Sequence, residues 1–240
     1  IIMKGRVMMR SYNTRKSYLP DKFSVTHLFL AIQIVIFLLM TLNGGSTNVL
    51  TLILFGAKFN PAIAQGEWWR LIAPMFIHIG FTHILVNSIT LYYLGTQMES
   101  LYGSLRFALI YLLSGLMGNL MSFAFNDSIS AGASTSLFGL FAAAIVLGRQ
   151  FPYNLGIQQM ARSFTMLIFL NFFFGFFSAA VDNFGHLGGA LGGALAAVFI
   201  AMPRTSKSQN GQRLLFLIIY FVNAIFFAYT GFMRAGFALY

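Results

Sequence analysis

Long apolar stretches separated by short polar breaks dominate the chain. Seven of them have about the length that an α-helix needs to cross the hydrocarbon core of a bilayer. They lie at about residues 27–42, 77–98, 105–125, 134–148, 164–181, 186–202 and 214–233. The breaks between the later stretches contain glycine, asparagine, aspartate or basic residues, which favour turns. The pattern therefore predicts seven transmembrane helices with short connections.

Residues 44–76, between the first two predicted helices, form a longer segment that is apolar only in patches. Lys58, Pro61 and the GEWWR cluster at residues 66–70 interrupt it. A tryptophan pair is typical of the bilayer interface. We expect this segment to be an interfacial hairpin that lies partly in the membrane.

Composition supports the membrane assignment. Hydrophobic residues make up 58% of the chain and charged residues only 8%, whereas a soluble domain carries about 25% charged residues. The chain has no cysteine, which excludes disulfides and thiolate chemistry. The expected fold class is an all-α, multi-pass integral membrane protein.

The basic charge is explained by membrane topology. The chain carries a formal net charge of +10, which by itself would also fit a nucleic-acid partner. With the N-terminus in the cytoplasm and the helices alternating in direction, 12 of the 15 Lys and Arg residues lie on the inside. The positive-inside rule requires such a bias. We therefore expect the protein to interact with the lipid bilayer and not with nucleic acid.

The same pattern divides the chain into three parts. We expect a basic cytoplasmic tail at residues 1–26 and a six-helix core at residues 27–202 that includes the interfacial segment 44–76. A cytoplasmic linker and a seventh helix follow at residues 203–240. The sequence contains no internal repeat and no second domain.

Polar side chains capable of chemistry fall early in three predicted helices that run in the same direction. They are His78, His83 and Asn87 in the second, Ser134 in the fourth and His186 in the sixth. At about 1.5 Å of rise per residue, His83, Ser134 and His186 lie roughly 22 to 27 Å from the inner interface. Residues 126–133 must then reach below the outer surface, where irregular backbone is tolerated only in protein or beside water. The sequence predicts a polar pocket open to the outside.

Ser134 and His186 could form a catalytic pair. Ser134 opens a predicted buried helix, whose free N–H groups could stabilise an oxyanion, although a serine there can also be a simple N-cap. The rows Gly188/Gly192 and Gly189/Gly193 let a neighbouring helix approach closely. If that neighbour carries Ser134, His186 can act as its general base. Alternatively, the glycines serve packing only and His186 bonds a backbone carbonyl.

His83 and Asn87 are four residues apart and share one helix face. Their imidazole and carboxamide N–H groups are donors suited to an oxyanion. The alternative is an interhelical hydrogen-bond pair that only joins helices.

The sequence gives little support to a catalytic triad, a metal site or a nucleophile elbow. The acidic residues lie away from the expected level of Ser134: Asp127 and Asp182 in outer loops, Glu99 at the inner end and Glu67 in the interfacial segment. Serine chemistry would therefore use a Ser-His dyad. HExxH is absent and the four histidines are scattered, so no metal and no cofactor are expected. Residues 132–136 read GASTS rather than GxSxG, so a nucleophile elbow is not indicated.

Taken together, these residues resemble the rhomboid family of intramembrane serine proteases. The resemblance covers roughly residues 60–202. Its motifs are Trp69-Arg70, His83-xxx-Asn87, Gly132-x-Ser134 and Gly185-His186-xx-Gly189-xxx-Gly193.

The resemblance implies cleavage of the transmembrane segments of membrane-protein substrates near the extracytoplasmic face of a bacterial plasma membrane. Ser134 would be the nucleophile, His186 the base, and the Ser134 N–H, His83 and Asn87 the oxyanion hole. The supporting positions would be Trp69, Arg70, His78, Glu99, Gly132, Phe138, Gly189 and Gly193, with Phe138 giving the His186 ring an aromatic surface. The seventh helix resembles the six-plus-one arrangement of the family.

One residue departs from the family pattern, because Thr135 stands where the family usually has glycine. Thr135 keeps its backbone N–H, and the position would suit it poorly only if it required a positive φ. Ser136 is a rival nucleophile, but it lies about 200° around the helix from Ser134.

Two other functions stay open: an inactive rhomboid-like protein that binds membrane clients, and a proton-coupled transporter. The absence of a repeat and the outer position of the polar set disfavour the transporter.

Overall fold

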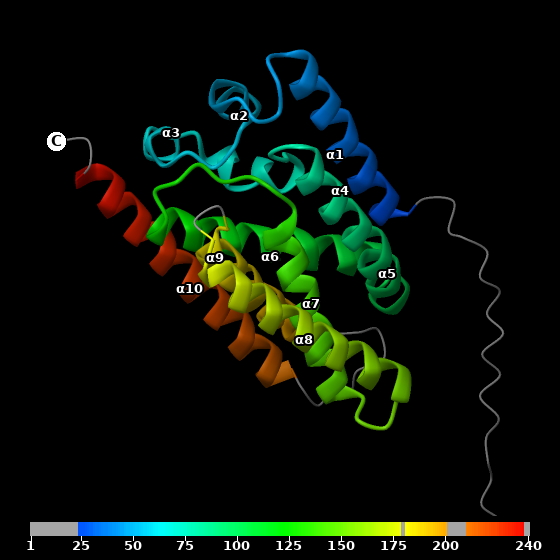
Figure 1. Ribbon diagram of the computed structural model, residues 1–240. Helices are drawn as coiled ribbons and strands as arrows, with labels where there is room; N and C mark the ends of the chain where they lie inside the picture. The colour runs from blue at the N-terminus through cyan, green and yellow to red at the C-terminus, as the bar shows by residue number, and fades with distance from the viewer. Residues whose placement is uncertain (1–23, 179–180, 201–209, 238–240) are drawn as a thin grey trace, which may run out of the picture.

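The architecture is helical throughout the part of the chain that the structure describes. A computed structural model describes residues 24–178, 181–200 and 210–237 (Figure 1). In these ranges the only β interaction is an isolated bridge between Lys58 and Ser130. Most of the predicted basic tail and of the predicted linker lies outside the described residues. The protein is an all-α membrane protein, as predicted.

The helices follow the order of the apolar stretches. The long ones are α1 (Val25–Leu42), α6 (Ser104–Phe125), α7 (Ser134–Gln150), α8 (Leu155–Phe176), α9 (Asn183–Ile200) and α10 (Asn210–Phe237). A further continuous stretch consists of α4 (Phe81–Thr90), the π-turn η3 (Leu91–Gly95) and α5 (Thr96–Tyr102). Among the described residues, four helices are long and apolar enough to cross a membrane by length and composition: α1, α6, α9 and α10. The protein is therefore a multi-pass integral membrane protein.

Several predicted spans have different boundaries in the structure, and the second and fifth show the reasons. The second was predicted from residue 77, but its helix begins at Phe81, after Gly80 at φ +81°. The fifth was predicted at residues 164–181, whereas α8 begins at Leu155 and ends at Phe176. Asn154 caps α8 by accepting a hydrogen bond from Ile157 N at 3.1 Å. Hydropathy missed the first turns of α8 because they carry polar residues, which a helix tolerates at its end.

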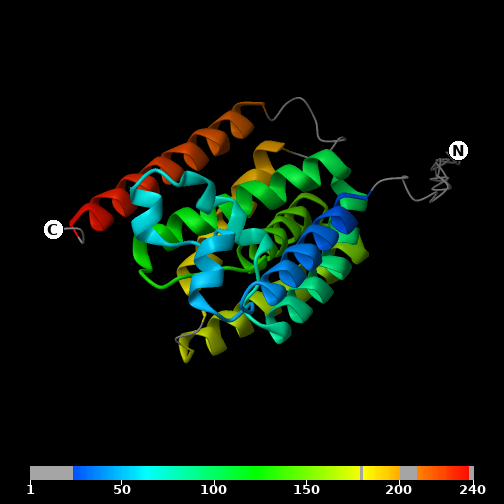
Figure 2. The same ribbon diagram turned by 90° about the horizontal axis from the view of Figure 1, so that it is seen from above.

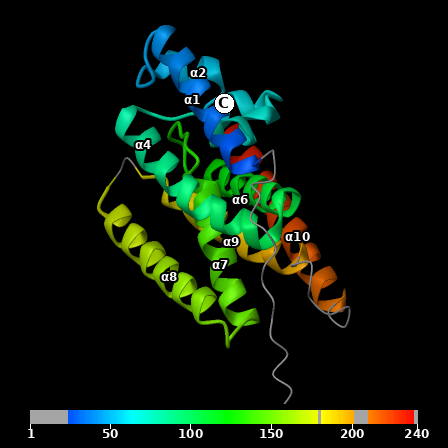
Figure 3. The ribbon, with the colours of Figure 1, turned by 90° about the vertical axis from the view of Figure 1, so that its right-hand side faces the viewer.

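The centre of the bundle is formed by α6, α7 and α9, with α10 against α6 and α9 and α8 against α7. Helix α8 stands at the edge of the bundle (Figure 3), while α1 and α10 lie on different sides of the central helices (Figures 1 and 2). Both glycine rows of α9 are packed, each against a different helix. A Cβ on Gly188 would lie 2.6 Å from Met121 Cβ on α6, and one on Gly189 would overlap the backbone of Thr135 on α7. Glycine at these positions lets α9 lie between both neighbours.

The segment 44–76 folds into short helices at one end of the bundle rather than into a simple hairpin (Figure 1). They are α2 (Val49–Phe55), α3 (Asn60–Ala64), η1 (Trp68–Leu71) and η2 (Ala73–Phe76). Arg70 is buried and donates to the carbonyls of Ile53 at 2.6 Å and Ala57 at 3.3 Å. Its guanidinium also lies 4.6 Å from the centre of the Trp69 ring. The Trp-Arg pair therefore holds this segment together and lies outside the pocket described below.

Candidate active site

Ser134 and His186 meet at the start of two central helices. Ser134 is the first residue of α7, and His186 lies in the first turn of α9. Their Oγ and Nε2 atoms are 2.9 Å apart, which is hydrogen-bond distance. The contact depends on the close approach of α9 to α7, which the absence of a side chain at Gly189 permits.

The His186 ring is held by packing. It stacks on Phe138, with ring centroids 4.1 Å apart and planes 11° from parallel. Its Nδ1 atom is buried and has no hydrogen-bond partner among the described residues. No described carboxylate therefore orients the ring through that nitrogen.

His83 lies beside Ser134 because Gly132 leaves room for it. Gly132 has φ +141°, and a Cβ there would lie 2.6 Å from His83 Cε1 and 3.6 Å from Ser134 Oγ. The backbone N–H of Ile79 donates to His83 Nδ1 at 3.4 Å, which in a neutral ring leaves the proton on Nε2. Asn87, one turn further along α4, donates one amide N–H to the His83 carbonyl at 2.9 Å and carries a second. Both side chains thus carry N–H donors, and both line the same pocket as Ser134.

Hydrogen bonds from two backbone N–H groups fix the chain just before Ser134. We refer to residues 126–133, which connect α6 to α7, as the serine loop. Near its end, Gly132 N donates to the Pro74 carbonyl at 2.9 Å, and Ala133 N donates to His78 Nε2 at 3.3 Å. His78 is fully buried and lies in the non-helical stretch before α4. Its ring thus supports the loop rather than facing Ser134.

A pocket of about 760 Å³ opens beside these groups. Its walls come from α4, the serine loop, α7, α8 and α9, and they include His83, Asn87, Ser134 and His186. Four polar side chains from three distant parts of the chain thus line one cavity. In the described ranges no three His, Cys, Asp or Glu side chains are grouped as metal ligands.

Asp182, which was expected in an outer loop away from Ser134, also lines the pocket. It precedes α9 and accepts hydrogen bonds from Ser122 Oγ and, at 2.9 Å, from Gly185 N. Burial alone raises the pKa of its carboxyl, but these hydrogen bonds and the nearby Lys58 lower the pKa below its ordinary value. Asp182 therefore caps α9 as a carboxylate. Its place one turn before His186 was the sequence signal that could have located it.

The two residues that follow Ser134 point away from the pocket. Ser136 is fully buried and faces α6, where a Cβ on Gly115 would overlap its Oγ. Thr135 is part of α7, so its φ is negative and a β-branched residue is not strained there. Its side chain packs where Gly118 and Gly185 provide space; Cβ atoms there would lie 2.8 Å and 3.2 Å from Thr135 atoms.

Glu99, the remaining predicted supporting residue, lies outside the pocket. Its carboxylate accepts hydrogen bonds from Val25 N at 2.8 Å and Ser104 Oγ at 2.6 Å. It therefore joins the start of α1 to α5 and α6.

Comparison with known proteins identifies the family. A family model described as the rhomboid domain matches residues 65–203. The chain is 41% identical over 210 residues to Rhomboid protease GluP of Bacillus subtilis (strain 168), covering 88% of this chain and 41% of that protein. It is 32% identical over 187 residues to Putative rhomboid protease YdcA of the same organism, covering 77% of this chain and 92% of that protein. The chain thus spans about two fifths of the length of GluP and most of YdcA. Since the family model matches more than half of its residues, the chain belongs to the rhomboid family.

Proposed function

We propose that this protein is an intramembrane serine endopeptidase that cleaves transmembrane segments of membrane-protein substrates near the extracytoplasmic face. The observation that carries the proposal is the 2.9 Å contact between Ser134 Oγ and His186 Nε2 beside a pocket. The similarity to Rhomboid protease GluP and Putative rhomboid protease YdcA supports the same activity.

In this mechanism His186 is the general base. It takes the proton from Ser134 Oγ as that oxygen attacks the scissile carbonyl, and it returns the proton to the leaving amine. Water then enters the pocket and hydrolyses the acyl-enzyme with the same base. The stacking of His186 on Phe138 supports a dyad, because packing orients the ring without a carboxylate.

Three donors are available for the oxyanion. Ser134 is the first residue of α7, so its backbone N–H has no partner within the helix. His83 supplies the Nε2 proton and Asn87 supplies its second amide N–H. Donors held in place before the reaction stabilise the negative charge that develops in the transition state.

We also propose that the pocket opens to the extracytoplasmic side, with a cytoplasmic N-terminus and seven membrane crossings in a bacterial plasma membrane. The distribution of Lys and Arg supports this orientation. The proposed organisation is a basic tail (1–26), a six-helix catalytic core (27–202) and a linker with a seventh helix (203–240).

A second candidate is an inactive rhomboid-like protein that binds membrane clients, and Thr135 is the residue that suggests it. The geometry favours an active enzyme, because Thr135 has a helical backbone and its side chain is accommodated by glycines. No observation favours a proton-coupled transporter over these two.

The test is labelling of the purified protein in detergent by a fluorophosphonate probe. We expect the wild type and Ser136→Ala to be labelled and Ser134→Ala to be unlabelled, with all three showing the same thermal midpoint. Ser136→Ala is the matched control, because it removes a hydroxyl from the same helical turn. Labelling of Ser134→Ala, or an unlabelled folded wild type beside a reactive rhomboid control, would overturn the proposal.

Cleavage itself is tested in proteoliposomes with single-pass model substrates. Product masses should place the cut near the extracytoplasmic end of the substrate helix, and Ser134→Ala should give no product. A cut near the cytoplasmic end would contradict the proposed orientation.

A further inference from the structure

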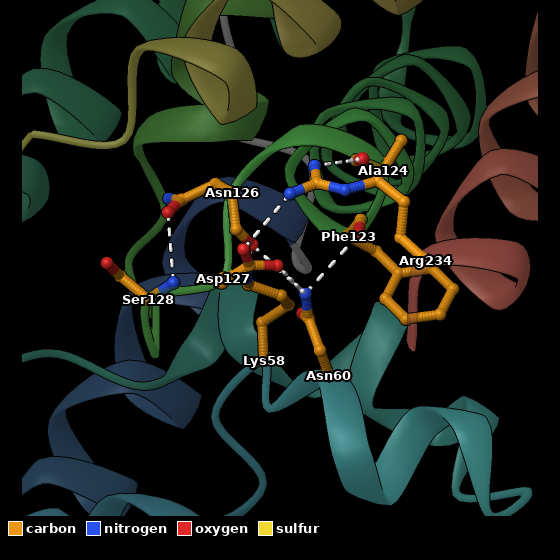
Figure 4. A network of polar contacts seen from close by, with 8 residues as sticks. All are labelled: Lys58, Asn60, Phe123, Ala124, Asn126, Asp127, Ser128 and Arg234. Carbon is orange, nitrogen blue, oxygen red and sulfur yellow. Dashed lines mark hydrogen bonds and ion pairs between the residues drawn. The ribbon is translucent and has the colours of Figure 1, made fainter. Parts of the chain in front are cut away.

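The start of the serine loop is held by polar side chains from two distant parts of the chain (Figure 4). Lys58, between α2 and α3, donates from Nζ to the Asn126 carbonyl at 2.6 Å. Arg234, near the end of α10, donates to the Ala124 carbonyl at 2.6 Å and pairs with Asp127 at 3.0 Å. Asn60 adds donor contacts to Asn126 O at 3.1 Å and Asp127 Oδ1 at 3.3 Å.

These contacts fall where helix α6 ends. The last carbonyls of a helix have no partner within it and carry partial negative charge. Cations are favourable at this position. Lys58 and Arg234 therefore stabilise the end of α6 and fix the point from which the serine loop departs.

Lys58 also holds the middle of the serine loop. Its backbone N–H donates to the Ser130 carbonyl at 2.8 Å, and Ser130 N donates back to the Lys58 carbonyl at 3.2 Å. The loop is thus fixed at Asn126 and at Ser130, four residues before Ser134. Displacement of Lys58 would release both points.

The charge on Lys58 is itself sensitive to its surroundings. The side chain is fully buried, and the charged groups around it are Asp182 before α9, Asp127 in the serine loop and Arg234 on α10. Burial lowers the pKa of the ammonium to about 8, although the two carboxylates oppose this shift and Arg234 adds to it. Lys58 is therefore protonated at neutral pH and loses its charge in mildly alkaline solution.

We propose that Lys58 and Arg234 are positioning residues that hold the serine loop so that Ser134 stays in line with His186. The seventh helix thereby contributes to the active site through Arg234. This inference rests on the proposed serine protease function.

A charged donor makes a stronger hydrogen bond than a neutral one. Ser134 should therefore be held less well above about pH 8. The rate of fluorophosphonate labelling should therefore fall in that range. Lys58→Met should label roughly 10 to 100 times more slowly at neutral pH, because small displacements of reacting groups have effects of that size. The labelling rate of Lys58→Met should also not fall at alkaline pH. Lys58→Arg keeps its charge throughout this range, so it should recover much of the wild-type rate, and its rate should not fall at alkaline pH.

The experiment measures labelling rates between about pH 6 and about pH 10 for the wild type, Lys58→Met, Lys58→Arg and Arg234→Met. Arg234→Met should label roughly 10 times more slowly, since it leaves the Lys58 contacts in place. The matched control is Arg149→Met, which removes an exposed cation from the opposite end of α7 and should keep the wild-type profile. A wild-type rate in Lys58→Met, or an alkaline fall that persists in it, would overturn the inference.

Hydrogen exchange of the peptide that spans residues 126–133 separates this inference from the proposed function. We expect faster exchange in Lys58→Met and Arg234→Met than in the wild type and Arg149→Met. This readout does not require activity. Unchanged exchange would overturn the positioning role even if Ser134 is reactive, whereas an unlabelled wild type with faster exchange in the variants would overturn only the proposed function.

Discussion

Two polar clusters mark the ends of one helical stretch and are built in opposite ways. His83, near the start of α4, belongs to the pocket around Ser134, and Glu99 lies in α5, roughly 24 Å further along at 1.5 Å per residue. The Glu99 carboxylate accepts five hydrogen bonds at 2.6–2.9 Å, from Ser24 Oγ, Val25 N, Thr26 N, Thr26 Oγ1 and Ser104 Oγ. Near Ser134, by contrast, His186 Nδ1, His78 Nδ1 and Thr135 Oγ1 are buried without a partner among the described residues.

The difference separates stability from reactivity. A buried polar group with all its partners contributes to folding, whereas one without a partner lowers the free energy of unfolding. The Glu99 cluster therefore joins helices, whereas the surroundings of Ser134 leave buried polar atoms without partners at some cost in stability. The comparison predicts that substitutions at Ser134's neighbours change activity, and those at Glu99's neighbours change stability.

The largest expected effect is on activity in the Ser134 cluster. His186→Ala removes the proposed base, so fluorophosphonate labelling should slow by about 10³-fold. The matched control is His27→Ala, which removes an exposed histidine from α1 and should label at the wild-type rate. A fast-labelling His186→Ala protein would remove the dyad from the mechanism.

A smaller loss is expected from the proposed oxyanion donors. His83→Ala and Asn87→Ala should each lower kcat for a model substrate by about 10²-fold with little change in KM, because the backbone donor at Ser134 remains. Asn223→Ala is the control for Asn87, since Asn223 makes the same donor contact to the carbonyl four residues earlier, but in α10. Equal effects of Asn87→Ala and Asn223→Ala would assign Asn87 a structural role alone.

In the Glu99 cluster the effect should appear in stability. Glu99→Gln places an amide group among five donors, and it should lower the free energy of unfolding by about 2 kcal/mol. The thermal midpoint in detergent measures the loss, and the labelling rate of the folded protein should stay near that of the wild type. A comparison of Ser104→Ala with Ser100→Ala refines the test, because of these two serines Ser104 donates to Glu99 and Ser100 donates to the Gln97 carbonyl. Ser104→Ala should therefore lower the midpoint more than Ser100→Ala. A large change in labelling rate with an unchanged midpoint would reverse the comparison.

Thr135→Gly should have the smallest effect. It restores the usual residue of the family, removes a side chain packed near Gly118 and Gly185, and adds a glycine to a helix. We expect about 1 kcal/mol lower stability and a labelling rate within about threefold of the wild type, since the Ser134 backbone donor is unaffected. A rate increase above about tenfold would show that Thr135 limits the enzyme.

Much of the fold was determined by the sequence alone. The predicted spans at 105–125 and 134–148 correspond closely to α6 and α7 because their apolar residues fill the whole helix. Prediction failed at α8, whose first turns are polar, since hydropathy detects the apolar centre of a helix and not its ends. The rise per residue also predicted a common level for His83, Ser134 and His186, and all three line one pocket.

Only the tertiary structure decided which side chains meet. The sequence showed two glycine rows in α9, but not that Gly189 faces α7 while Gly188 faces α6. It placed Asp182 in a loop, although that loop borders the pocket. It gave no sign that Lys58 bonds the Asn126 carbonyl, 68 positions later. Periodicity along a chain encodes which face of a helix is buried and how deep a residue lies. The choice of neighbouring helix depends on packing among all the helices at once, so only the folded bundle determines it.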